Sequence, residues 1–214
     1  MSNSLKMARL DYFTFKSQIV AYTALALMTI MFSVMGSSFI TLNITVSWFA
    51  ALLSMNIFAI QEKNELDRLY ASLSFSLKNI IGGRYIFTFV NYALASIVTI
   101  MIGITVSFLQ NRNVDYADII LGVCISLFAF SLITGIQIPI YFNLGYTKAR
   151  AWCMVPYVLV MVICILSSFM DVFSSIIAGL TEHQMVLGMI SLMFSFISIP
   201  VSYHLSVMSY QKRR

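Results

Sequence analysis

The longest uncharged run in the sequence restricts the chain to very few folds. Residues Ser17 to Gln61, 45 in all, contain no Asp, Glu, Lys or Arg. About 20 apolar residues are enough for a helix to cross the hydrocarbon core of a bilayer. The run is therefore long enough for two crossings, and lipid must act as part of the solvent. We predict an all-α membrane protein whose backbone hydrogen bonds close within each helix.

Further uncharged runs predict four more spans, which makes six in a single transmembrane domain over residues 1–214. The expected spans cover about residues 19–39, 42–60, 85–109, 119–142, 151–170 and 184–207. The turn between the first two is expected at Gly36 to Ser38, with Thr41 and Asn43 in the same polar stretch. Val172 to Leu180 is apolar but too short to span, which predicts a re-entrant or interfacial segment.

The N-terminal residues differ from the spans because they mix charges with regularly spaced apolar side chains. Leu5, Leu10 and Phe13 recur at roughly helical spacing. The charged residues of this segment are Lys6, Arg9, Asp11 and Lys16. Such a pattern is typical of an amphipathic helix that lies in the membrane surface. A plain charged leader is the alternative that the sequence leaves open.

The basic residues decide the predicted orientation. The chain is 60% hydrophobic and 10% charged, with a net charge of +5. A positive charge can favour nucleic-acid binding, but here the charges lie in short connections between apolar runs, where they determine topology. With six spans, 12 of the 13 basic residues fall on one side, and only Arg112 falls on the other. Because basic loops stay in the cytoplasm, both termini and residues 61–84 are expected there, with no nucleic-acid partner.

The sequence contains no pattern for catalysis or metal binding. There is no G-x-x-x-x-G-K-[ST] loop for ATP and no H-E-x-x-H motif. Cys124, Cys153 and Cys164 lack metal-ligand spacing. The spans also lack the series of ionisable side chains that marks a proton or ion path. We therefore expect no catalytic, cofactor-binding or metal-binding residues, which disfavours an intramembrane enzyme or a small secondary transporter.

Uncharged polar side chains inside the spans have two possible roles. The candidates are Asn56, Asn91, Gln137 and Asn143. Such residues usually join helices by hydrogen bonds within the membrane. Some of them can instead face a transport pathway, and the sequence leaves both roles open.

The connection between the second and third expected spans has the pattern of a helix. Leu66, Leu69 and Leu73 recur at i, i+3 and i+7, while the charges fall mainly on the rest of the surface. This spacing predicts a short amphipathic helix from Glu62 to Leu73. A connector that lies on the membrane without a partner is the alternative.

A glycine pair follows this helix. Gly82 and Gly83 are expected to break the helix before the third span. Arg84 and Tyr85 come next, and they are expected to mark the membrane interface where that span begins.

Two local motifs resemble those of ABC-2 type transporter permeases. The stretch from Glu62 to Tyr85 resembles the family's acidic, Asn-containing helix and the sLPvsR-x-x-iV-x-x-[KR]Y segment that follows it. Ser74 stands at the family's proline position, and Leu77 stands at its arginine position with Lys78 next to it. The stretch from Pro139 to Arg150 resembles the family's P-l-x-f-x-x-G-x-x-K-a-R segment. Both motifs fall on the side that the basic residues assign to the cytoplasm.

The resemblance implies the membrane half of an ATP-driven exporter. In that family a separate ABC ATPase subunit, with its ATP and Mg²⁺, docks on the cytoplasmic face, and two identical or related permease chains enclose the pathway. Small members in Gram-positive bacteria move peptides, including bacitracin-like and lantibiotic peptides and phenol-soluble modulins. This implies a multi-pass cell-membrane protein that exports an amphipathic peptide or similar hydrophobic compound. A membrane-embedded accessory or immunity protein with no pathway of its own stays open as the alternative.

The resemblance also implies which residues connect ATP hydrolysis to the spans. The expected ATPase-coupling residues are Glu62, Asn64, Leu66, Asp67, Arg68, Leu69, Leu73, Lys78, Gly145, Lys148 and Arg150. Gly82 and Gly83 are expected to form a hinge through which this helix moves the third span. Gly145 is also expected to end the fourth span or make the turn after it. Lys148 and Arg150 are expected to anchor the fifth span at the interface.

Overall fold

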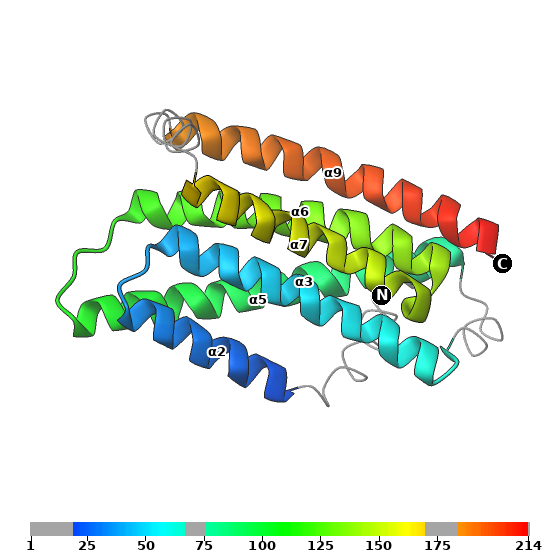
Figure 1. The fold of residues 1–214 in the computed structure, drawn as a ribbon, viewed down its shortest axis with the longest axis horizontal. Coiled ribbons are helices and arrows are strands. Elements are labelled where there is room, and N and C mark those ends of the chain that lie inside the picture. The colour runs from blue at the N-terminus through cyan, green and yellow to red at the C-terminus, as the bar shows by residue number, and fades with distance from the viewer. Residues whose placement is uncertain (1–18, 67–75, 170–183, 214) are drawn as a thin grey trace.

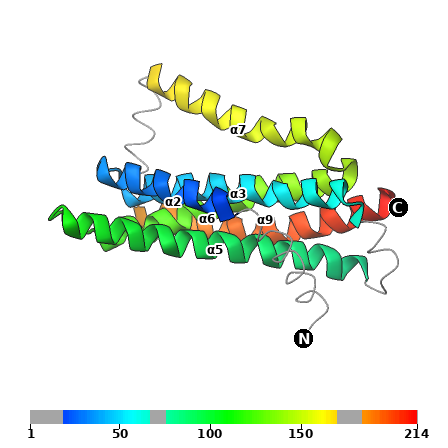
Figure 2. The same ribbon diagram turned by 90° about the horizontal axis from the view of Figure 1, so that it is seen from below.

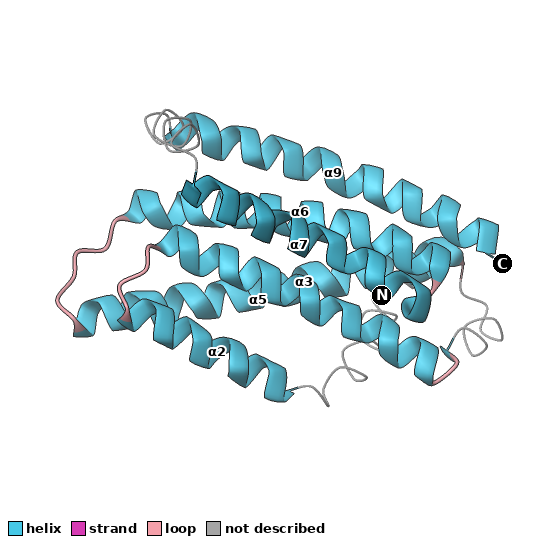
Figure 3. Cartoon of the chain, in the orientation of Figure 1, coloured by secondary structure: helices cyan, strands magenta, loops and turns pink. Residues whose placement is uncertain are grey.

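The chain forms a bundle of long helices that run side by side (Figure 1). The computed structural model describes residues 19–66, 76–169 and 184–213. Its helices are α2 (Ile19–Val34), α3 (Phe39–Lys63), α5 (Leu77–Leu109), α6 (Tyr116–Leu144), α7 (Tyr146–Phe169) and α9 (Gln184–Arg213). The described residues contain no strand (Figure 3). The prediction of an all-α protein is therefore confirmed for this part of the chain.

Four of the described helices have the length and apolar composition to cross a membrane. They are α3, α5, α6 and, in α9, residues Met185–Gln211. The apolar part of α2, Val20–Val34, is shorter. The described helices thus support four spans, and the count of six stays a prediction. The expected N-terminal amphipathic helix and the segment Val172 to Leu180 lie outside the described residues.

The turn between α2 and α3 covers residues 35–38 and so includes the predicted Gly36 to Ser38. Ser38 caps α3, since its hydroxyl accepts a hydrogen bond from the Thr41 backbone N–H at 3.3 Å. Thr41 and Asn43, which were expected to mark the turn, therefore both lie inside α3. The buried Asn43 amide donates to the Phe39 carbonyl and accepts from the Ser96 hydroxyl of α5, both at 3.0 Å. These two bonds satisfy its polar atoms inside the bundle.

The glycine pair does not break a helix. Gly82 and Gly83 lie within α5, which begins at Leu77 and continues without interruption to Leu109. In a membrane helix, contacts with neighbouring helices offset the weak helical preference of glycine. Here the next residues, Arg84 and Tyr85, are buried and bonded to other helices, which fixes this turn of α5. The connection between α3 and α5 is correspondingly shorter than residues 61–84.

A line of small side chains joins α6 and α9, the most extensively packed pair among the described helices. Ser191, Ser195, Ser202 and Ser206 are buried on one face of α9. Their spacing of 4, 7 and 4 residues keeps them on the side that meets α6. Small residues let two membrane helices approach closely without a gap. By contrast, Figure 2 shows α7 starting beside the other helices and leaning away from them along its length.

Candidate functional site at one end of the bundle

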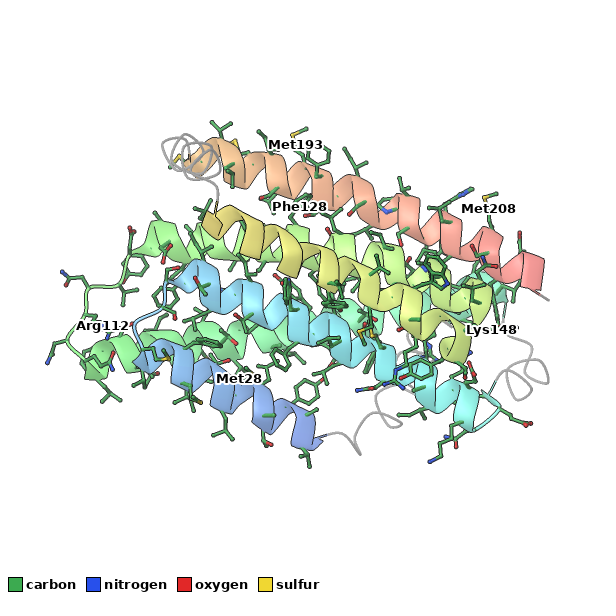
Figure 4. All side chains as sticks on the ribbon, viewed as in Figure 1. Met28, Arg112, Phe128, Lys148, Met193 and Met208 are labelled. Atoms are coloured by element: carbon green, nitrogen blue, oxygen red, sulfur yellow. The ribbon has the colours of Figure 1, made fainter. Side chains whose placement is uncertain are left out.

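The predicted cytoplasmic connections meet at one end of the bundle. The last turn of α3, the start of α5, the end of α6 and the start of α7 gather there (Figure 1). Lys148 lies at this end, and Arg112 lies at the opposite one (Figure 4). We call the end with Lys148 the inner end and the end with Arg112 the outer end. The structure thus separates the two groups of connections in the way that the basic residues predict.

At the inner end, a carboxylate of α3 caps the N-terminus of α7. Glu62 Oε2 accepts a hydrogen bond from the Tyr146 backbone N–H at 2.5 Å and from the Thr147 backbone N–H at 3.2 Å. The Thr147 hydroxyl also donates to Glu62 Oε1. Negative charge at a helix N-terminus meets unpaired N–H groups and the positive end of the helix dipole. Glu62 therefore joins the two predicted cytoplasmic connections directly, and we call this contact the Glu62 clamp.

Gly145 explains why α7 needs a cap from another helix. Its N–H donates to the Tyr141 carbonyl at the end of α6, and its own carbonyl accepts from the Ala149 N–H at 3.0 Å in α7. It has φ 77° and ψ 170°, a conformation that is essentially restricted to glycine. The prediction that Gly145 ends the fourth span is confirmed. Because glycine has no side chain to cap α7, the Glu62 carboxylate supplies the cap.

Next to the clamp, α3 and α5 are joined through a buried arginine. Arg84 of α5 is only 1% exposed, and its Nη2 donates to Gln61 Oε1 at 2.7 Å. Its guanidinium also lies 5.1 Å from the centre of the Phe58 ring. Arg84 lies inside α5, which begins two turns earlier, and its expected place at the membrane interface stays a prediction. A buried charge is costly unless it is paired, so these contacts hold the helices in one register.

Aromatic rings fill the space between the clamp and the bundle interior. Phe58 of α3 stacks on Tyr141 of α6 at 4.8 Å, and Tyr141 stacks on Tyr146 of α7 at 5.8 Å. Phe142 of α6 meets Tyr210 of α9 at 5.1 Å. Aromatic pairs at these distances add to the free energy of packing. The last turns of α3 and α6, the first turn of α7 and the end of α9 are thus packed around one cluster.

The described part of the expected ATPase-coupling set lies around this end. Glu62 is in the last turn of α3, and Asn64 is the C-cap of that helix. Glu65 then has φ 48°, which turns the chain away from α3. The predicted helix from Glu62 to Leu73 therefore does not begin at Glu62. Leu66 is half-buried, while Asp67, Arg68, Leu69 and Leu73 lie outside the described residues.

The basic members of that set are exposed at the inner end. Lys78 lies in the first turn of α5, and Lys148 and Arg150 lie in the first two turns of α7. Because all three side chains are exposed at the inner end, carboxylates of another protein could reach them.

The four candidate pathway residues do not share one location. Asn91 accepts a hydrogen bond from the Tyr22 hydroxyl at 2.8 Å, which joins α2 to α5. Gln137 is buried and donates to the Cys153 carbonyl and the Tyr157 hydroxyl, which joins α6 to α7. Asn56 is half-buried in α3, and Asn143 is exposed near the end of α6. Asn91 and Gln137 thus have the helix-packing role that was one of the two alternatives.

An apolar groove lies near the outer end. It has a volume of about 380 Å³ between the first turns of α6 and α9. Its walls include Ala117, Leu121, Cys124, Met185, Gly188 and Leu192. A groove of this size and composition fits an apolar chain better than a polar ligand.

Sequence reasoning missed the partners of Glu62, Arg84 and Asp118. Asp118 of α6 accepts a hydrogen bond from the Phe39 N–H at 2.9 Å, at the start of α3. These pairs join residues far apart in the chain, so no local spacing reveals them. One signal was available, because the α9 serines recur at helical spacing and predict a close helix contact.

The fold and the Glu62 clamp together define a helical membrane protein. Its α3–α5 and α6–α7 connections are joined at the inner end. A family model described as ABC-2 family transporter protein matches residues 6–211, almost the entire chain. The chain therefore belongs to the ABC-2 transporter family and is an ABC-2 type permease, and the resemblance seen in the two motifs is confirmed. Members of this family are membrane subunits of transporters, which normally work with an ABC ATPase and are not themselves catalytic. No curated protein matches the chain.

Proposed function

We propose that the chain is the permease subunit of an ATP-driven exporter and that a separate ABC ATPase acts on its inner end. The Glu62 clamp is the observation that carries this proposal. It fixes the start of α7 to the last turn of α3, immediately before the connection that contains residues 67–75. A force applied to that connection therefore reaches α7 through Glu62 and α5 through the chain itself.

The exposed basic residues support the same partner. Lys148 and Arg150 lie beside the clamp, where they are available to acidic side chains of an ATPase subunit. ATP and Mg²⁺ belong to that subunit. A second permease chain, identical or related, completes the pathway. In this arrangement Asp67, Arg68, Leu69 and Leu73 also contact the ATPase, and Gly82 and Gly83 adjust the start of α5.

The proposed cargo is an amphipathic peptide or a similar hydrophobic compound. The apolar groove between α6 and α9 supports this class, because its lining offers burial to an apolar chain. Release of such a cargo at the outer end agrees with the position of the groove near the first turns of both helices.

The proposed orientation places the inner end in the cytoplasm of a Gram-positive cell, with both termini on that side. In a background with the native cysteines replaced, we expect Ser37→Cys and Asn113→Cys to react with an impermeant thiol reagent in intact cells. Lys148→Cys should react only after the membrane is opened, because basic residues concentrate at the inner end. Reaction of Lys148→Cys in intact cells would overturn this orientation.

The first test of function is co-purification of an ABC ATPase with the tagged chain from cells that make it, followed by measurement of ATP hydrolysis and export. Glu62→Gln keeps the size of the side chain and removes its charge. A loss of about 1 kcal/mol at the clamp corresponds to about fivefold in the clamped population. We therefore expect transport-linked ATP hydrolysis to fall about fivefold while membrane insertion is retained.

The matched control is Asp118→Asn, which removes the same charge from the N-terminus of α3 at the outer end. Ser38 still caps α3 in that variant, so hydrolysis and export should remain normal. If Glu62→Gln matches the unmodified chain, the clamp is not the coupling contact. If no ABC ATPase co-purifies with the chain, an accessory or immunity protein becomes the better explanation.

A further inference from the structure

Tyr85 lies where α5, α6 and α9 meet. Its hydroxyl is 2.5 Å from Ser202 Oγ and 3.0 Å from Ser206 Oγ, both on α9. Ser202 Oγ in turn donates to the Gly135 carbonyl of α6 at 2.7 Å. All three hydroxyl-bearing side chains are buried. A single chain of hydrogen bonds therefore connects three helices in the bundle interior.

The direction of every bond in this chain follows from its last acceptor. The Gly135 carbonyl can only accept, so the Ser202 hydroxyl proton is directed to it. The Tyr85 hydroxyl must then donate to Ser202 Oγ, and the Ser206 hydroxyl donates to Tyr85. Each donor in the series strengthens the next one. Removing the Tyr85 hydroxyl therefore weakens the bond that Ser202 makes to α6.

Pro139 explains why the Gly135 carbonyl is available. In an uninterrupted helix this carbonyl would accept the N–H of the residue four positions later, which is Pro139. Proline has no N–H, and its ring presses against that carbonyl and bends the helix. Ser202 occupies the place of the missing donor. The series from Ser206 through Tyr85 and Ser202 thus ends at the point where α6 bends most easily.

A second tyrosine–serine pair on the same helix lacks this feature. Tyr92 of α5 is buried, and its hydroxyl lies 2.6 Å from Ser126 Oγ of α6. Ser126 donates to the Val123 carbonyl of its own helix at 3.0 Å, and no proline follows four residues after Val123. The pair therefore joins α5 to α6 without supporting a proline bend.

We propose that Tyr85 is a positioning residue of the transport cycle: it directs Ser202 onto the Gly135 carbonyl and so sets the bend of α6 at Pro139. Tyr85 lies in the third turn of α5, next to Arg84, which bonds α3. Motion at the start of α5 reaches α6 and α9 through this hydroxyl, in addition to the bond that the Tyr203 hydroxyl of α9 donates to the Lys78 carbonyl. This inference rests on the proposed permease function.

The test compares Tyr85→Phe with Tyr92→Phe, which lose the same hydroxyl from the same helix. Tyr85→Phe loses its buried bonds to Ser202 and Ser206, and Tyr92→Phe loses its buried bond to Ser126, so both melting temperatures should fall, that of Tyr85→Phe further. Tyr85→Phe should also lower export per ATP hydrolysed by about fivefold, whereas Tyr92→Phe should leave this ratio unchanged. If the two variants lower export per ATP equally, or neither does, Tyr85 has only a packing role and the proposal is overturned.

Pro139→Ala tests the same proposal by restoring the backbone N–H that Pro139 lacks. Alanine restores an N–H to the Gly135 carbonyl, so the melting temperature should rise by about 2–4 °C while export per ATP falls. In this background Tyr85→Phe should cost less stability than in the unmodified chain, because the Gly135 carbonyl no longer depends on Ser202. A Pro139→Ala chain that exports normally would show that α6 does not need to bend there.

A measurement without the ATPase separates this proposal from the proposed function. Amide hydrogen exchange of the purified chain reports local opening of α6 around residues 135–139. Tyr85→Phe should speed exchange there, and Tyr92→Phe should not. If the unmodified chain shows no coupling to an ATPase, the proposed permease function is contradicted. The exchange difference between the two variants would still support the role of Tyr85 in the bend of α6. Equal exchange in both variants would remove the proposed role of Tyr85.

Discussion

The same type of contact, a carboxylate at the N-terminus of another helix, occurs at both ends of the bundle, but the surrounding residues differ. At each end, a carboxylate from one helix accepts hydrogen bonds from the first backbone N–H groups of another: Asp118 at the outer end and Glu62 at the inner end. At the outer end α3 also has its own cap, Ser38. At the inner end α7 follows Gly145, which has no side chain to serve as a cap. The start of α7 thus depends on another helix.

The outer end has further contacts that hold it closed. Gln110 donates to the Val34 carbonyl at 3.3 Å, which links the α5–α6 turn to the end of α2. The Arg112 guanidinium packs against Gly36 in the α2–α3 turn, 2.5 Å from the position that a Cβ would take. Because several weak contacts hold the outer end together, the loss of one of them should leave the others in place. The difference is that α3 has a cap of its own at the outer end, whereas the start of α7 at the inner end depends on the Glu62 side chain of another helix.

The largest effect is expected from the buried Arg84 near the inner end, compared with the exposed Arg112 at the outer end. Arg84→Ala should lower the free energy of unfolding by about 3 kcal/mol, because it removes a buried donor to Gln61 and the contact with Phe58 and leaves a cavity. Thermal unfolding in detergent should show a midpoint lower by about 6–12 °C.

Arg112→Ala is the matched substitution at the outer end. Arg112 is exposed, so its removal should change the free energy of unfolding by less than about 0.5 kcal/mol. Equal midpoints for the two variants would contradict the assignment of Arg84 as a structural link between α3 and α5.

Arg84 also shows where sequence reasoning reaches its limit. The uncharged runs predict the helices well, because a membrane helix must satisfy its backbone locally. The helix break at the glycine pair was mispredicted, and the burial of Arg84 was missed, because both depend on partners in other helices. Gly145 was predicted correctly, since a glycine between two apolar helical runs has a local conformational reason to be there. The Glu62 clamp joins residues 84 positions apart, and no local pattern contains it.

The next effect concerns Gly36 and Gly145, the two glycines with positive φ in the part of the chain that the structure describes. Gly145→Ala should cost about 2 kcal/mol, because φ 77° with ψ 170° is a conformation that alanine avoids. It should also displace the first turn of α7 from Glu62, so export and ATPase stimulation should fall together with the melting temperature.

Gly36→Ala provides the comparison at the outer end, where φ is 84°. A Cβ there displaces only the flexible end of Arg112, so the cost should be about 1 kcal/mol from the backbone alone. ATPase stimulation should stay normal once both proteins are assayed below their melting temperatures. A similar loss of stimulation in Gly36→Ala would remove the distinction between the ends.

The smallest effect on stability is expected from the exposed charges beside the clamp. Changing Lys148 and Arg150 together to Gln should alter the free energy of unfolding by less than about 0.5 kcal/mol, because both side chains are exposed and neither supports the core. Binding of the ATPase should nevertheless weaken, and the difference from the unmodified chain should shrink at high salt, because screening shortens the reach of surface charges. Co-purification of the ATPase at low and high ionic strength measures this.

Anchoring of α7 at the interface is the competing role for these two residues, and it predicts lower membrane insertion with unchanged ATPase binding. Unchanged insertion and binding in the double variant would exclude both roles for Lys148 and Arg150 and would leave ATPase contact to the connection between α3 and α5.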